Sequence, residues 1–241
     1  MAAAVIVLSV LVVTPVAALI YGSLSTVGLI GQTGGGFTLD NYITVITDPE
    51  TYTLFLNSLT YAFGASIISL FLGFLLSWIV FRTNTPFRRL FEVISIVPYI
   101  IPGILYIISW MFLLSPHMGI INKFLMSLFN LGSAPFDVKT LGGMIFVSGL
   151  SGTPICFMIM GAAMQSMDPS LEEAAKVSGS GTLNLLRSVI FPILKPAVLS
   201  AFFLALFRLL ENFQAPALLG MPRFFVFTTK IYRLTAIYPP N

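Results

Sequence analysis

The sequence has very few charged residues. Asp, Glu, Lys and Arg together make up 9% of its 241 residues, whereas soluble domains carry about 25%. Hydrophobic residues reach 57%, and the mean hydropathy is +0.96. This composition lies far outside the range of soluble domains and indicates a protein of the lipid bilayer.

The residues that build disulfide frameworks and metal clusters are also scarce. The chain has one cysteine, Cys156, inside an apolar run, and one histidine, His117, without Cys, His or carboxylate companions. We therefore expect no metal site, with Cys156 as a small packing residue and His117 as a loop residue. The formal net charge of +3 is modest and the basic residues are scattered, which argues against nucleic acid as a partner.

Catalytic and nucleotide-binding motifs are missing as well. The sequence lacks HExxH and paired Asp residues at membrane depth, so a membrane-embedded enzyme is disfavoured. It also lacks a Walker motif, so we expect no nucleotide site and no cofactor in this chain. A secondary transporter or channel, kept as an alternative, would usually carry an inverted repeat or selectivity elements.

Long apolar segments dominate what is present. Five of them are long enough to cross about 30 Å of hydrocarbon, which takes roughly 20 helical residues. They cover residues 2–21, 57–81, 93–114, 141–167 and 196–219. The sequence therefore predicts an all-α, polytopic membrane helix bundle. Residues 1–56 would form the first membrane helix and an outer loop, and residues 57–241 the core, with a cytoplasmic loop at 168–195.

Prolines interrupt two of these predicted spans. Pro98 and Pro102, next to Gly103, lie in the third span, and Pro154 lies near Gly152 in the fourth. Each proline leaves a backbone carbonyl without its helical partner and predicts a kink. Kinked helices can make room for a translocation path, but they also occur in membrane bundles without transport roles.

Two ionisable residues fall inside the fifth predicted span. Arg208 lies near its middle, and Glu211 follows one turn later on the same helix face. A charge at membrane depth costs at least about 2.5 kcal/mol on insertion scales, so both side chains should face the bundle rather than lipid. Either a pore-lining pair or a structural ion pair would explain them.

Loops rich in Lys and Arg predict the orientation, since such loops stay in the cytoplasm. The loop of residues 22–56 has neither residue type, whereas two later loops and the C-terminal tail do. These are Arg82, Arg88 and Arg89; Lys176, Arg187 and Lys195; and Arg223, Lys230 and Arg233 in the tail. The tail conflicts with the two loops, and we follow the loops, which place the N-terminus and residues 168–195 in the cytoplasm.

A charged island, DPSLEEAAKVSGSGTLNLLRSVIFPILKP at residues 168–196, separates the fourth and fifth spans. Asp168 followed by Pro169 predicts a helix start, because the carboxylate can cap the first turn. Gly179 and Gly181 predict its end, and a second short helix should follow and stop at Pro192. The product is a short helix pair that could present a compact face to a partner.

The spacing inside this island carries a resemblance. Glu173, Ala174 and Ala175 are followed after three residues by Gly179, and after nine more by residues 189–192, VIFP. This resembles the EAA motif of binding-protein-dependent ABC transporter permeases, in which E-A-A, three residues, G and nine residues precede I-x-L-P. The resemblance implies a set of residues that couple to the ATPase, namely Glu172, Glu173, Ala174, Ala175, Gly179 and Pro192.

The same resemblance implies partners, a location and a cargo. The partners are a cytoplasmic ABC ATPase dimer, a second permease half or copy, and an extracytoplasmic solute-binding protein, in the bacterial inner membrane. Residues 211–241 are most similar to the ferric-iron type of permease, which implies a further membrane helix after Asn241 and ferric iron as the first solute to consider. Permeases for polyamine, phosphonate or thiamine share much of this sequence style.

Overall fold

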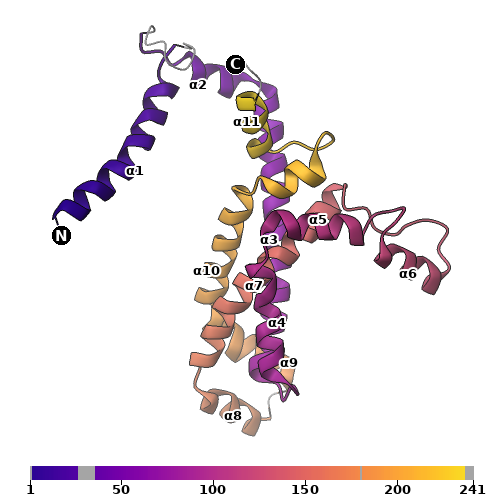
Figure 1. Ribbon diagram of the computed structural model, residues 1–241. Coiled ribbons are helices and arrows are strands. Elements are labelled where there is room, and N and C mark those ends of the chain that lie inside the picture. Colours follow the sequence, from indigo (N-terminus) through magenta and orange to yellow (C-terminus); the bar gives the residue numbers. More distant parts are fainter. Residues whose placement is uncertain (1, 27–35, 180, 237–241) are drawn as a thin grey trace. The chain divides into compact units, whose positions relative to one another are not determined.

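The chain folds almost entirely into helices (Figure 1). The computed structural model describes residues 2–26, 36–179 and 181–236, and these ranges hold no β-strand, only one isolated bridge between Ser25 and Phe37. The chain divides into two units, Met1–Leu56 with Lys230–Asn241, and Asn57–Thr229. The predicted all-α class is confirmed, and the second unit contains both sites described below.

The first unit contains α1 (Ala2–Ser23), α2 (Asp40–Thr47), the start of α3 (Pro49–Arg82) and most of α11 (Phe227–Ala236). Asn41 ties α2 to the end of α1, because its Nδ2 donates to the carbonyl oxygens of Ser23 and Ser25, each at 3.0 Å. Lys230 Nζ lies 2.6 Å from Glu50 Oε2. This ion pair joins α11 to the start of α3.

The contact between α3 and α7 (Leu141–Ser166) forms the centre of the second unit. The helices approach closely at Gly73, where an added Cβ would lie 2.5 Å from the Cβ of Cys156. Ser77 Oγ donates across the same contact to the Phe157 carbonyl oxygen at 2.9 Å. Small residues and crossing hydroxyl bonds are how membrane helices associate. Cys156 is fully buried here, so its predicted packing role is confirmed.

The structure has fewer straight spans than predicted. Among the described residues, three helices are long and apolar enough to cross a membrane: α3, α7 and the helix over Leu186–Leu210. α1 (Ala2–Ser23) coincides with the first predicted span, and its 22 residues match the length that a crossing requires. α7 continues through Pro154 as one helix, without a break.

The predicted third span is broken into two helices. α4 (Arg88–Ile100) and α5 (Gly103–Leu113) meet at an angle of 104° and make a fourth candidate span only as a bent pair. Ile101 is extended, with ψ of 129°, because Pro102 disfavours helical backbone in the residue before it. The predicted kink is therefore confirmed at Pro102, whereas α4 continues through Pro98.

The predicted fifth span starts and ends earlier than expected. α10 covers Phe191–Leu210 and continues without interruption from a π-helical turn, η1 (Leu186–Ile190). The expectation that Pro192 ends the preceding helix is wrong. Phe191 N–H donates to the Leu186 carbonyl, five residues back, and this wider turn carries the chain past Pro192, whose missing N–H is tolerated at the start of α10.

The connection between α5 and α7 contains α6 (Ile120–Phe129). Asn122 is fully buried and holds this connection together, since its Nδ2 donates to the carbonyl oxygens of Leu114 at 2.9 Å and Phe136 at 2.8 Å. His117 is exposed just before α6, as predicted for a loop residue. The described part of the chain contains no group of three His, Cys, Asp or Glu that could hold a metal ion.

Candidate coupling loop and membrane cavity

Residues 168–196 begin with the short helix that the sequence predicts. α8 covers Pro169–Val177, and Asp168 stands just before it. Asp168 Oδ1 accepts the backbone N–H of Ser170 at 2.9 Å. This hydrogen bond favours the charged form and holds the pKa of the Asp168 carboxyl below its usual value. The carboxylate therefore caps the first turn of α8 at neutral pH.

Gly179 ends α8. Its φ of +81° lies in the left-handed region, which residues with a Cβ rarely adopt. An added Cβ would meet nothing within 4 Å, so the backbone conformation alone requires glycine. Ser178 N–H still donates to the Ala174 carbonyl at 3.0 Å, so the last helical turn is intact. α9 (Thr182–Leu185) follows and continues through η1 into α10, so the predicted start of a second helix is confirmed but its predicted end is not.

The inner side of this loop packs on the ends of membrane helices. Its buried cluster contains Met164, Met167, Leu185, Ile190 and Leu194, with Phe74, Trp78, Phe81 and Ala175 partly buried against it. Arg82, at the end of α3, donates to the carbonyl oxygen of Met164, near the end of α7. α8 is thus anchored through Ala175 to the same end of the unit at which α3 and α7 terminate (Figure 1).

The outer side of α8 is uncovered. Glu173 and Ala174 are exposed, and Val177 is 90% exposed despite being apolar. This face of α8 is therefore open to contact with another chain. The side chain of Glu172 lies outside the described residues. Pro192 is exposed as well, but it lies beyond η1, in the first turn of α10.

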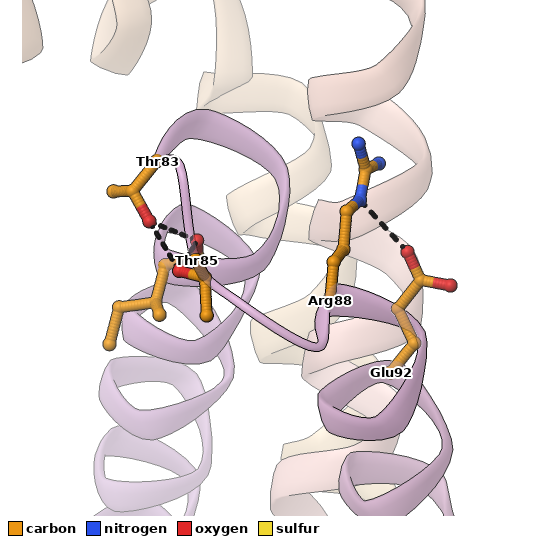
Figure 2. A network of polar contacts seen from close by, with 5 residues as sticks. Thr83, Thr85, Arg88 and Glu92 are labelled. Carbon is orange, nitrogen blue, oxygen red and sulfur yellow. Dashed lines mark hydrogen bonds and ion pairs between the residues drawn. The ribbon is translucent and has the colours of Figure 1, made fainter.

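The neighbouring loop between α3 and α4 carries its own polar contacts (Figure 2). The hydroxyls of Thr83 and Thr85 lie 2.6 Å apart. Arg88 Nε pairs with Glu92 Oε1 across one turn of α4 at 3.1 Å, and its guanidinium carbon lies 4.9 Å from the ring centroid of Phe81. These contacts fix the start of α4 beside the end of α3.

A second site lies at the break between α4 and α5. A cavity of about 760 Å³ is bounded there by the break, by α7, by the last turns of α10 and by the segment that leads to η2 (Pro216–Gly220). Its volume is within the range of small-molecule sites. Six of its polar lining residues are Tyr99, Ser148, Ser151, Arg208, Glu211 and Gln214.

Arg208 and Glu211 both line this cavity, but no ion pair joins them within the described ranges. Arg208 Nη1 instead donates to Tyr99 Oη at 3.3 Å, and its guanidinium carbon lies 5.3 Å from the Tyr99 ring centroid. Glu211 is the last residue in helical conformation, at the C-cap of α10, and its N–H donates to the Phe207 carbonyl at 3.1 Å. The predicted pairing is not observed, although both side chains face a cavity rather than a packed core.

Sequence reasoning missed the other polar groups of the cavity. Tyr99 lies directly beside Pro98, so the proline break was the available signal for it. Gln214 could not have been found in this way. The first atom that a Cβ at Gly103 would meet is Gln214 Oε1, so the Gln214 side chain reaches the start of α5.

Comparison with known proteins agrees with this arrangement. A family model described as "Binding-protein-dependent transport system inner membrane component" matches residues 65–240. Two bacterial ABC transporters of alginate, an acidic polysaccharide, share the fold. One has a TM-score of 0.76 at 21% identity over 96% of this chain and 81% of that chain. The other, in complex with an alginate pentasaccharide-bound periplasmic protein, has a TM-score of 0.78 at 20% identity over 97% and 80%.

Similar sequences carry several cargo names. The ferric transport system permease protein FbpB of Actinobacillus pleuropneumoniae is 26% identical over 83% of this chain and 28% of its own length. The sulfate permease protein CysT of Salmonella typhimurium is 28% identical over 72% and 61%, and the sn-glycerol-3-phosphate permease protein UgpA of Yersinia enterocolitica is 28% identical over 73% and 58%. The chain therefore spans less than two thirds of each of these relatives. Because the family model matches well over half of the chain, the chain belongs to the binding-protein-dependent transport system inner membrane components.

Proposed function

We propose that this chain is the permease subunit of an ABC importer and forms half of a path for a solute across the bacterial inner membrane. The observation that supports this most strongly is the fold of residues 168–192. Their inner side is packed on the ends of α3 and α7, and their outer side presents an exposed Glu173 and a bare Val177. A stiff helix pair of this kind can pass rigid-body motion from a docked chain to the membrane helices.

The docked chain would be a cytoplasmic ATPase dimer, which binds ATP on behalf of this subunit. A second permease half or copy would complete the path, and an extracytoplasmic solute-binding protein would deliver the solute. The family description supports this set of partners, and one structural neighbour is in complex with a periplasmic protein. The chain itself would act without an ATPase site of its own.

Ferric iron is the first cargo to test, because a relative named for ferric transport matches 83% of this chain. Sulfate and sn-glycerol 3-phosphate stand beside it, since relatives of similar identity carry those names. Polyamine, phosphonate and thiamine remain alternatives, because permeases for these solutes share much of this sequence style. These cargoes differ in charge, so the charged residues that line the cavity at the α4–α5 break bear on the choice among them.

The docking assignment can be tested by reversing one exposed charge. Glu173→Lys should leave membrane insertion intact but abolish both co-purification of the ATPase and solute uptake. Asp40→Lys makes the same change on α2, another short helix, and should leave both unchanged. Normal ATPase co-purification and uptake in Glu173→Lys would show that α8 is not the docking element.

The orientation, with the N-terminus and α8 in the cytoplasm, can be tested with single cysteines in a Cys156→Ala background. Gly132 and Gly181 are both exposed with open space around them. A membrane-impermeant thiol reagent applied from outside should label Gly132→Cys and spare Gly181→Cys. Labelling of Gly181→Cys from outside would overturn the orientation and the docking assignment together.

A further inference from the structure

The cavity at the α4–α5 break contains the guanidinium of Arg208, which forms no ion pair with a carboxylate among the described residues. Arg208 lines it from α10, and its described contacts are the hydrogen bond and the ring contact with Tyr99. A guanidinium has five N–H donors, of which this hydrogen bond uses one. The remaining donors are available to a group inside the cavity.

Tyr99 fixes where that charge points. Arg208 belongs to α10 and Tyr99 to α4, so the contact between them joins two walls of the cavity. A guanidinium over a tyrosine ring is attracted by the negative face of the ring, while the N–H groups at the edges of the guanidinium stay free for hydrogen bonds. The guanidinium is therefore aimed into the cavity, in a geometry suited to the paired oxygens of a carboxylate or phosphate.

The start of α5 adds to the positive electrostatic potential of the cavity. α5 begins at Gly103, on the cavity wall, and no side chain caps its N-terminus. The first amides of a helix carry partial positive charge and favour a nearby anion. This contribution supports the one from Arg208 and would not define a site without it.

Glu211 sets a second requirement on the ligand. Its carboxylate also lines the cavity without an ion pair among the described residues, and Ser148 and Ser151 lie on the facing α7 wall. A carboxylate only accepts hydrogen bonds when ionised, whereas serine hydroxyls donate and accept. A ligand that forms hydrogen bonds with both residues therefore carries an anionic group that accepts from Arg208 and hydroxyl groups that donate to Glu211.

We infer that this cavity is a transit site for a small hydroxylated anion, such as a polyol phosphate or a sugar acid, with Arg208 taking the charge. The inference rests on the proposed function, because it names the solute class of the same permease. It disfavours polyamine and thiamine, which are cations. Ferric iron would pass only as an anionic complex with ligands of its own, since the described residues hold no metal-binding cluster.

The test uses the assembled membrane complex in nanodiscs, without the solute-binding protein, so that only the membrane site can bind. Four probes are titrated by calorimetry: sn-glycerol 3-phosphate, sulfate, glycerol and spermidine. We expect sn-glycerol 3-phosphate to bind more tightly than sulfate, and glycerol and spermidine not to bind. Arg208→Gln should weaken sn-glycerol 3-phosphate by about 10- to 100-fold, the range for hydrogen bonds to a charged group.

Three further variants separate the roles. Arg208→Lys keeps the charge but loses the planar fork, so it should bind with intermediate affinity. Glu211→Gln should reduce the advantage of sn-glycerol 3-phosphate over sulfate and leave sulfate itself unchanged. Arg223 is an exposed arginine of the same unit that does not line the cavity, so Arg223→Gln should change nothing.

Three results would overturn the inference. If spermidine bound and Glu211→Gln abolished that binding, the cavity would be a cation site. Equal losses of sn-glycerol 3-phosphate affinity in Arg208→Gln and Arg223→Gln would show that the anion is attracted only by the general surface charge. A wild-type complex that hydrolyses ATP and imports solute but binds no anion would remove the site while leaving the proposed function in place. Failure of the chain to assemble with an ATPase would instead contradict the proposed function.

Discussion

A side chain at Gly179 should strain the protein, because of the backbone conformation alone. At φ of +81° a residue with a Cβ is strained by about 1–2 kcal/mol. An added Cβ would meet nothing within 4 Å, so Gly179→Ser should cost about that amount and no more. Gly181 offers a matched control, because its Cβ would also meet open space and its backbone lies outside the left-handed region.

The control should behave in the opposite way. Gly181 precedes α9, and its carbonyl accepts the N–H of Leu185 at 2.9 Å. It therefore occupies the N-cap position, where serine is among the favoured residues, and Gly181→Ser should be neutral or stabilise by a few tenths of a kcal/mol. The two variants make the same chemical change two positions apart, so their difference reports the backbone conformation at Gly179.

Hydrogen exchange measured by mass spectrometry can resolve this difference in the detergent-solubilised complex. The strain should open the last turn of α8, which the hydrogen bond from Ser178 N–H to the Ala174 carbonyl closes. A cost of about 1–2 kcal/mol corresponds to roughly 5- to 30-fold faster exchange at Ser178 in Gly179→Ser. Gly179→Asn should accelerate the exchange at Ser178 less than Gly179→Ser does, since Asn tolerates the left-handed region. Equal exchange in Gly179→Ser and Gly181→Ser would refute the argument.

Three other expectations concern packing, pH and the cavity. Gly73→Ala should lower the free energy of unfolding by about 1–3 kcal/mol, because its Cβ would overlap α7; Gly142→Ala, which meets open space, should not, and equal melting temperatures would contradict the close contact. The depressed pKa of Asp168 means that its cap on α8 is fully present above its unfolded pKa of about 3.9 and is lost as the pH falls through the lower folded value. Protection of the first α8 amides, corrected for intrinsic exchange, should therefore be flat from pH 7 to 5 and decline below about 4, and Asp168→Asn should remove that decline. A double-mutant cycle with Arg208→Gln and Tyr99→Leu should show a coupling of about 0.5–2 kcal/mol in thermal stability, and additive effects would mean that the contact contributes nothing.

Local signals were sufficient for the coupling loop. The start of α8 depends on Asp168 and Pro169, and its end depends on the backbone of Gly179, all of which act on immediate neighbours in the chain. Helix capping is decided within a few residues, so it can be read from sequence. The apolar runs similarly predicted the membrane helices, because burial in lipid depends on composition over a window of about 20 residues.

Local signals failed where two distant segments decide the outcome. The sequence placed Glu211 one turn from Arg208 and so suggested a pair, but Arg208 meets Tyr99, a residue 109 positions earlier. Likewise, Pro192 carried the signal of a helix end, and the π-turn at η1 carries the helix past it. Composition and nearest-neighbour chemistry determined the class of this protein, most of its helices, and the start and end of α8. Only the packing of α4 and α10 against α7 decided which polar side chains share a cavity, because that choice depends on contacts between residues far apart in the chain.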